Sequence, residues 1–158
     1  MIKTMTSKIG VISDTHGLVR PEAIEALQGC ELILHAGDIG KPEVLEKLKA
    51  IAPVIAVRGN NDKGEWAEAI PERETLKIEA VSIHLLHIIQ ELSIVPQSSG
   101  IHLIISGHSH KPAIQERDGV LYLNPGSAGP RRFKLPVSIA HLHICDRQVQ
   151  AEIVELSV

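Results

Sequence analysis

Short apolar runs alternate with amphipathic segments over the first third of the chain. The runs at residues 8–13, 31–35 and 53–57 are rich in Ile, Val and Leu, which is typical of buried parallel strands. Between them, the segment that starts at Pro21 and residues 42–51 repeat apolar side chains at helical spacing. Both segments open with proline, which is favourable at the first helical position. This alternation predicts a β-α-β-α-β unit with parallel strands and right-handed crossovers.

The second half of the chain is patterned mainly as strands. Asp118-Gly119 separates two apolar runs and indicates a tight hairpin. A short helix is predicted over residues 90–95, and the charge-rich residues 63–74 are predicted to form a loop or short helix. The predicted strands are residues 76–80, 82–87, 102–106, 112–117, 120–123, 137–145 and 148–155. The whole pattern predicts an α/β fold in which two mixed β-sheets pack face to face, flanked by helices.

Composition narrows the class of protein. A length of 158 residues with 44% hydrophobic content suits a single domain over residues 1–158, with an aliphatic core because the chain has one Trp, one Tyr and one Phe. The net charge of −3 leaves no basic field for long nucleic acid. Cys30 and Cys145 lack metal-ligand spacing and are expected to be free thiols. Residues 1–8 have no apolar signal-peptide core, so we expect a soluble, cytoplasmic protein with no membrane partner.

Polar residues follow the predicted strands at the point where each strand ends. Because the carboxyl ends of parallel strands meet at one edge of a sheet, these side chains are expected to lie at one rim. A glycine at position 37, 59 or 107 precedes several of them and allows a sharp turn and close approach. The seven candidate ligands are Asp14, His16, Asp38, Asn60, His87, His108 and His110.

The ligand types indicate a metal site. Four imidazoles, two carboxylates and one amide oxygen suit Mn, Fe, Ni, Co or Zn, with Mn favoured, rather than the all-oxygen shell of Mg or Ca. Two divalent ions would carry four positive charges, and Asp14 and Asp38 would supply two negative charges. The remaining positive charge can hold a phosphate oxygen, and two ions can hold both the attacking and leaving oxygens of a displacement. The sequence therefore predicts two divalent ions per chain in a hydrolytic site.

The ordered motifs Asp-x-His, Gly-Asp, Gly-Asn-x-Asp, a lone His and Gly-His-x-His resemble the calcineurin-like metallophosphoesterase superfamily. Residues 107–112 and 124–127 resemble its small single-domain phosphodiesterase branch. The resemblance implies a four-layer αββα sandwich and attack on phosphorus by a metal-bridging hydroxide without a covalent intermediate. It also implies roles for individual residues: Asp14, His16 and His110 bind the first metal, Asn60, His87 and His108 bind the second, Asp38 bridges both, and Asp38, Asn60 and His108 are catalytic.

Two departures from the family pattern bear on activity. Many members have histidine where this chain has Asn61, and an amide donates a hydrogen bond to substrate but cannot act as a general acid. Asp62, which would orient that histidine, loses that role, and catalysis on esters with poor leaving groups is expected to be weaker. His87 is commonly followed by glycine, whereas Ile88 and Ile89 follow it here. Bulk at this point is expected to narrow the pocket or move the loop.

Several residues have two open interpretations. Arg132, beside Arg131, either grips phosphate or belongs to an exposed basic pair. Trp66 either caps the pocket or contacts a partner, or it is buried. His35 is a core residue or a donor behind the ligands. Finally, His141 and His143 share one strand face, where a solvated surface is favoured over a metal pair.

Two functions follow from these residues. The favoured one is a metal-dependent phosphodiesterase that hydrolyses a small phosphate ester or nucleotide. The alternative is a catalytically inactive protein-binding scaffold of the retromer-subunit type, which belongs to the same small branch. Loss of ligand histidines would mark the scaffold, and this chain keeps His16, His108 and His110. A homo-oligomer formed through Trp66 or through Ile88 and Ile89 stays open.

Overall fold

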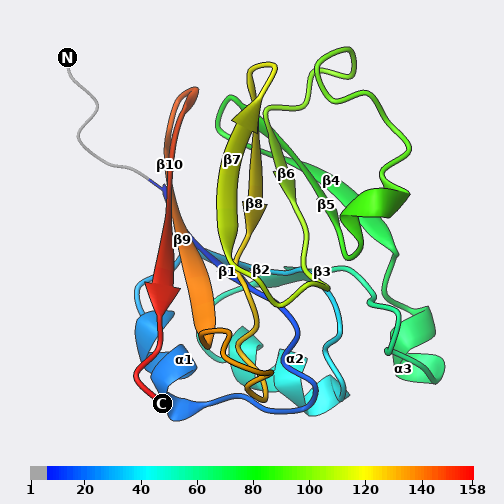
Figure 1. The fold of residues 1–158 in the computed structure, drawn as a ribbon, viewed down its shortest axis with the longest axis vertical. Helices are drawn as coiled ribbons and strands as arrows, with labels where there is room; N and C mark the ends of the chain where they lie inside the picture. Colours follow the sequence, from blue (N-terminus) through cyan, green and yellow to red (C-terminus); the bar gives the residue numbers. More distant parts are fainter. Residues whose placement is uncertain (1–6) are drawn as a thin grey trace.

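A computed structural model describes residues 7–158. Residues 1–6, part of the segment predicted to lack a signal-peptide core, lie outside the described residues. The elements in chain order are β1 (Ser7–Ile12), α1 (Pro21–Ala26), β2 (Leu32–His35), α2 (Pro42–Lys49), β3 (Val54–Ala56), α3 (Glu65–Glu68), β4 (Arg73–Ile78), β5 (Val81–Leu86), the 3₁₀ turn η1 (Ile89–Glu91), β6 (Leu103–Ile105), β7 (Ala113–Arg117), β8 (Val120–Asn124), β9 (Ser138–Cys145) and β10 (Gln148–Glu155). Figure 1 shows their arrangement.

The first sheet has the strand order β10-β9-β1-β2-β3. Strands β1, β2 and β3 are parallel, whereas β9 runs antiparallel to β1 and β10 antiparallel to β9. The predicted β-α-β-α-β unit is therefore present. In register, Ile12 at the end of β1 pairs with His35 at the end of β2. The chain that leaves each strand starts from the same sheet edge, and the Asp14 N–H donates to Gly37 O at 2.9 Å.

The second sheet has the order β4-β5-β6-β8-β7 and is also mixed, because β5, β6 and β8 are parallel and the edge strands are antiparallel. Strand β4 begins at Arg73, before the predicted start at residue 76. Its exposed face carries Arg73, Thr75 and Lys77. The strand starts earlier than predicted because Arg73 and Glu74 belong to the charge-rich run 63–74, which was predicted to form a loop or short helix. The helix predicted over residues 90–95 is wrong, because only η1 forms there and Leu92 is already extended.

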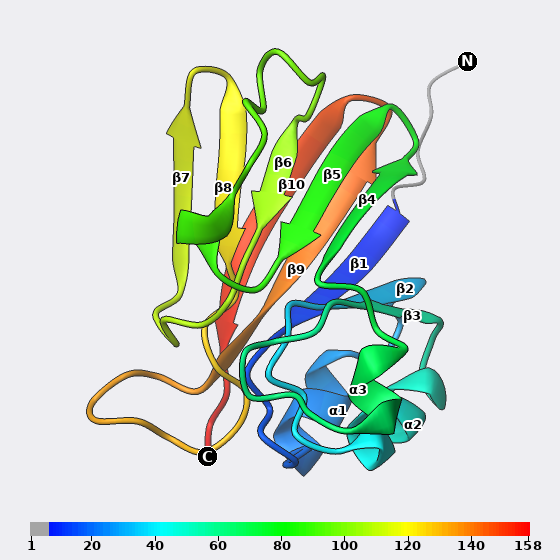
Figure 2. The same ribbon diagram turned by 90° about the vertical axis from the view of Figure 1, so that its right-hand side faces the viewer.

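Three apolar clusters hold the layers together. The largest lies between the two sheets and includes Val11, Leu34 and Leu85. A second lies between the first sheet and helices α1 and α2, and Trp66 packs partly buried against it, which agrees with the burial interpretation. The outer face of the second sheet is covered by η1 and the loop around it, where Ile89 packs against the third cluster. Figure 2 shows the two sheets with the helices gathered at one end.

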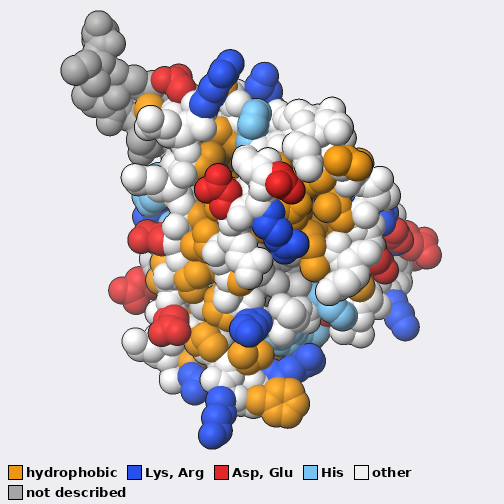
Figure 3. All heavy atoms as spheres, turned by 45° about the horizontal axis from the view of Figure 1, so that its top comes forward, with side chains coloured by type: hydrophobic (Ala, Val, Ile, Leu, Met, Phe, Trp, Pro, Cys, Tyr) orange, Lys and Arg blue, Asp and Glu red, His pale blue; other side chains and the backbone are white. Residues whose placement is uncertain are grey.

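No helix within residues 7–158 combines the length and the apolar character that a membrane crossing requires. Cys30 is buried and Cys145 is partly exposed, and both are free thiols as predicted. On the face shown in Figure 3, acidic and basic side chains occur together with hydrophobic ones.

Candidate metal centre

Five of the seven predicted ligands have left-handed backbone conformations. The φ angles are 55° at Asp14, 48° at His16, 56° at Asp38, 72° at His108 and 63° at His110. Such angles are uncommon outside glycine, although Asp, Asn and His tolerate them better than other residues do. Residues of this kind gather at functional sites, where the surrounding structure holds them in place. The turns that follow β1, β2 and β6 therefore point to a site at this edge of the sandwich.

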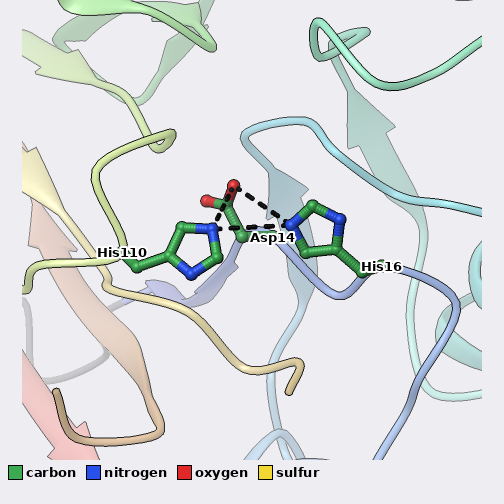
Figure 4. Close-up of side chains that lie close together, drawn as sticks. All are labelled: Asp14, His16 and His110. Atoms are coloured by element: carbon green, nitrogen blue, oxygen red, sulfur yellow. Dashed lines mark hydrogen bonds and ion pairs between the residues drawn. The ribbon is translucent and has the colours of Figure 1, made fainter. Parts of the chain in front are cut away.

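Asp14, His16 and His110 form a first group, which Figure 4 shows in close-up. Asp14 is fully buried, and its Oδ2 accepts hydrogen bonds from the Ser13 hydroxyl at 2.6 Å and from the His108 N–H at 3.1 Å. Its Oδ1 lies 3.3 Å from His110 Nε2 and 3.9 Å from His16 Nε2. One carboxylate oxygen is thus fixed by hydrogen bonds, while the other faces two imidazoles across a gap suited to a cation.

Asp38, His87 and His108 form a second group beside the first. Asp38 Oδ2 lies 3.3 Å from His87 Nε2, and the rings of His87 and His108 meet edge to face with centroids 5.2 Å apart. Asn60 Oδ1 accepts from His108 Nδ1 at 3.2 Å, which places the amide at the exposed side of this group. His16 Nε2 is 3.8 Å from Asp38 Oδ2, so Asp38 lies between the two groups. All seven predicted ligands therefore come together, and we call them the ligand cluster.

The protonation pattern of His87 argues for cations in the cluster. Its Nδ1 lies 2.7 Å from the Ala36 carbonyl, which can only accept, so Nδ1 carries the hydrogen. In the neutral ring Nε2 then carries a lone pair and can only accept, yet it faces the carboxylates of Asp38 and Asp14, which also only accept. Both His87 Nε2 and Asp14 Oδ1 are buried without a hydrogen-bond partner. Metal ions, one in each group, would give both atoms a partner, so the residues fit the metals that the sequence predicts.

The pKa shifts show that a proton would compete with a metal ion for Nε2 of His87. Burial lowers the pKa of His87, but the Asp38 and Asp14 carboxylates outweigh burial, so its pKa lies above the ordinary value. Burial raises the pKa of Asp38, but contacts from His87 and Asn61 outweigh it, so its carboxyl pKa lies below the ordinary value. The pKa of Asp14 is lowered in the same way, with His110 and Ser13 opposing burial. Both carboxylates are therefore ionised at neutral pH and available as ligands.

Glycines at positions 37, 59 and 107 allow the ligands to lie this close, and a Cβ on Gly37 would collide with the ring of His87. A Cβ on Gly59 would collide with the backbone nitrogen and Oδ1 of Asp38, and a Cβ on Gly107 would collide with the Ser13 hydroxyl and the Asp14 carboxylate. The sequence predicted close approach of backbone to the ions at these positions. The structure shows that the backbone packs directly against the ligand side chains.

Asp62 has a role that the sequence did not reveal. Its carboxylate accepts backbone N–H groups from Ile39 at 3.1 Å, Gly40 at 2.9 Å and Gly59 at 2.9 Å. These bonds tie the turn after β2, which carries Asp38, to the turn after β3. The available signal was that Asp62 is the Asp of the Gly-Asn-x-Asp motif. Because Asn61 replaces the histidine that this Asp would orient, the sequence pattern left Asp62 without a role. Asn61, expected to contact substrate, donates its side-chain amide to Asp38 Oδ2 at 3.0 Å; its role toward substrate stays a prediction.

Two further residues behind the cluster were missed or left open. Asn124 donates its amide to Gly107 O at 3.0 Å and to the Ser109 hydroxyl at 3.1 Å, which fixes the turn that carries His108 and His110. His35 lies behind the first two turns, where its ring contacts Thr15 and Gly37. His35 is therefore both a core residue and a support for the ligands. The sequence singled out both positions, Asn124 within residues 124–127 and His35 as a core residue or a donor, but it did not give these contacts, because they depend on the tertiary fold.

The residues around the cluster differ in how they relate to it. Arg58 forms an ion pair with Glu72 at 3.0 Å. A cleft of about 220 Å³ borders Asn60 and His87, and Ile88 lines it while His87 stays buried. Arg132 is exposed in the long connection between β8 and β9, and within residues 7–158 no hydrogen bond or ion pair joins its guanidinium to the ligand cluster. The phosphate contact of Arg132 stays a prediction.

A sandwich of two mixed sheets with carboxylates and imidazoles gathered at the strand ends defines a class of metal-dependent phosphoesterases. The chain belongs to the calcineurin-like phosphoesterase superfamily, whose domain model matches residues 7–147. A curated relative from Methanothermobacter thermautotrophicus, called a probable metallophosphoesterase, is 39% identical over 92% of this chain and 91% of its own length. Family membership supports a metal-dependent phosphoesterase.

Two solved structures of similar fold bear on function. An archaeal phosphodiesterase superposes with a TM-score of 0.77 at 26% identity, covering 93% of this chain and 99% of its own. Vps29 from Entamoeba histolytica in complex with zinc superposes with a TM-score of 0.74 at 26% identity, covering 94% of this chain and 98% of its own. The same fold therefore occurs in a phosphodiesterase and in Vps29.

Proposed function

We propose that this chain is a single-domain phosphodiesterase that hydrolyses small phosphate esters at a centre of two divalent metal ions. The observation that supports it is the pair of facing groups, with the unpartnered Asp14 Oδ1 and His87 Nε2 buried between them. Asp14, His16 and His110 would hold one ion. Asn60, His87 and His108 would hold the other, and Asp38 would contact both.

The bound ions would supply Lewis-acid neutralisation of phosphate charge and a water of lowered pKa. The protein's part is positioning. Asn61 keeps the Asp38 carboxylate oriented through its backbone N–H at 2.9 Å and its side-chain amide. Ser13 and the His108 N–H hold one oxygen of Asp14, which directs the other toward the imidazoles.

The range of substrates follows from what Asn61 cannot do. Its amide donates a hydrogen bond but cannot protonate a departing alkoxide at neutral pH. Esters with acidic leaving groups, such as aryl diesters, should therefore turn over faster than alkyl esters. The cleft beside Asn60 and His87 would take the ester group, and it offers both signs of charge because Arg58, Arg73, Glu72 and Glu91 line it.

The test is turnover of bis-p-nitrophenyl phosphate by protein loaded with Mn²⁺, with bound metal measured by mass spectrometry. We expect activity and about two ions per chain, as a two-metal site requires. Asp38→Asn should abolish turnover and lower bound metal. Asp118→Asn is the matched control, because Asp118 has a similar φ of 50° in the hairpin turn away from the cluster. Folded protein that shows no turnover with any first-row divalent metal would sink the proposal.

A second candidate, a protein-binding scaffold, is favoured by the similarity to Vps29. Because that Vps29 structure contains zinc, metal binding alone does not separate the two functions. Turnover does: a scaffold would bind metal without hydrolysing the diester, and Asp38→Asn would then leave the assay unchanged.

A further inference from the structure

A second set of metal-type ligands lies on the outer face of the first sheet, away from the ligand cluster. His141 and His143 alternate along β9 on the same face, and Glu152 of β10 is directly opposite His141 in the antiparallel register. One ligand atom from each of the three residues lies within 4.8 Å of the other two. The sequence favoured a solvated face here, because the pairing that brings Glu152 to the histidines was not visible in the chain.

The orientation of His141 leaves two acceptors facing each other. Its Nε2 lies 2.7 Å from the carbonyl oxygen of Ala26, the last residue of α1, so Nε2 must carry the hydrogen and donate it. In the neutral ring Nδ1 then carries a lone pair and acts as an acceptor. It lies 3.3 Å from Glu152 Oε1, which is also an acceptor. This is the pattern seen at His87, where a carbonyl holds one ring nitrogen and the other faces a carboxylate. A backbone carbonyl bound to the far nitrogen is a common support for a metal-binding histidine.

The spacing of the ligand atoms suits a tetrahedral ion. Glu152 Oε1 lies 3.3 Å from His141 Nδ1 and 3.7 Å from His143 Nε2. Ligand atoms around tetrahedral zinc, with bonds of about 2.0–2.1 Å, are roughly 3.3 Å apart. The site is open to solvent through a shallow depression lined by His143, Gln150 and Glu152. Lys8 lies opposite His143 on β1. Its ammonium group donates to Gln28 O at 3.5 Å, so this neighbouring cation has a partner of its own.

We propose that His141, His143 and Glu152 bind one borderline divalent cation, of the class of Zn²⁺, at a site separate from the phosphoesterase centre. Two imidazoles and one carboxylate form a donor set that this class prefers. The fourth position is open to water or to an external ligand. Because His141 also holds the end of α1, the bound ion links that helix to β9 and β10.

The test compares zinc binding by the full chain and two surface variants. Each protein is dialysed to equilibrium against a buffered micromolar concentration of free Zn²⁺, and bound zinc is measured by mass spectrometry. The wild-type chain should bind one zinc ion more than His143→Ala, and its melting temperature should rise more with zinc. His143 is partly exposed, and the variant should keep the far-UV spectrum and the Mn²⁺-dependent diesterase rate of the wild type.

Two substitutions of Gln150 complete the test, one as the matched control and one that should bind zinc more tightly. It lies opposite His143 on the same face, so Gln150→Ala alters the site's edge while keeping all three ligands and should bind as much zinc as the wild type. Gln150→His supplies a further imidazole and should tighten zinc binding at least about tenfold, since it completes a four-ligand set. Equal zinc content in the wild type and His143→Ala would overturn the proposal and leave the His141–Glu152 contact as an ion pair held by a proton.

Discussion

The buried histidine His35 should make the stability of the fold depend on pH. Its ring is fully buried behind the ligand turns. Nδ1 accepts the Gly37 N–H at 3.1 Å. The Thr15 hydroxyl donates to Ile39 O at 2.8 Å, so the Nε2–H of His35 donates to Thr15 Oγ1 at 3.0 Å. The neutral ring therefore satisfies every partner, whereas a second proton on Nδ1 would point at the Gly37 N–H.

The magnitude follows from the pKa. Burial is the main cause that lowers the pKa of His35 from 6.5 to about 4, and the Asp14 and Asp62 carboxylates oppose it only in part. Between these values the unfolded chain binds a proton that the folded chain refuses, so the free energy of unfolding falls as pH drops from about 6.5 to about 4. At about 1.4 kcal/mol per pH unit, this one residue removes about 3 kcal/mol over that window, and its contribution is fully present above pH 6.5.

The assay is urea unfolding of metal-free protein at a series of pH values between 4 and 7.5, with His35→Asn as the comparison. Asn keeps an acceptor near the Gly37 N–H but does not titrate. The variant is expected to be less stable throughout, so the informative quantity is the slope. The wild-type slope should exceed the variant's by up to about 1.4 kcal/mol per pH unit within the window. Parallel profiles for the two proteins would refute the reasoning.

Three further changes test the supports of the cluster. Asp62→Ala removes the acceptor of three backbone N–H groups and should lower the free energy of unfolding by about 3 kcal/mol or more in urea titrations; a loss below about 1 kcal/mol would contradict its role. Gly59→Ala forces a methyl group onto Asp38 and should reduce bound Mn²⁺ and turnover at least about tenfold. In the control Gly29→Ala the added methyl meets open space, so the left-handed φ of 83° should lower stability but leave bound Mn²⁺ and turnover unchanged. Asn124→Ala should raise the Mn²⁺ concentration for half-maximal activity several-fold, and an unchanged metal titration would count against it.

Most elements, and the gathering of the seven candidate ligands, could be predicted because each leaves a local signal. Period-3.6 and β-rich runs marked the helices and most strands, and the ligands followed strand ends in order. Strand β4 was placed late because Arg73 and Glu74 end the charge-rich run 63–74, where charge favoured a loop or short helix. Glu152 was not connected with His141 because cross-strand neighbours depend on register, which a single sequence does not display.

The contacts that hold the ligands explain why the site depends on so few visible residues. Left-handed conformations at the ligands cost free energy, and something must hold them. Three side chains outside the ligand cluster supply that restraint: His35 joins the turns after β1 and β2, Asp62 joins those after β2 and β3, and Asn124 fixes the turn after β6. Because these bonds are internal to the protein, the ligand cluster should assemble before any metal binds. Metal binding would then require little free energy to order the loops, and loss of a support should weaken the proposed site without removing a ligand.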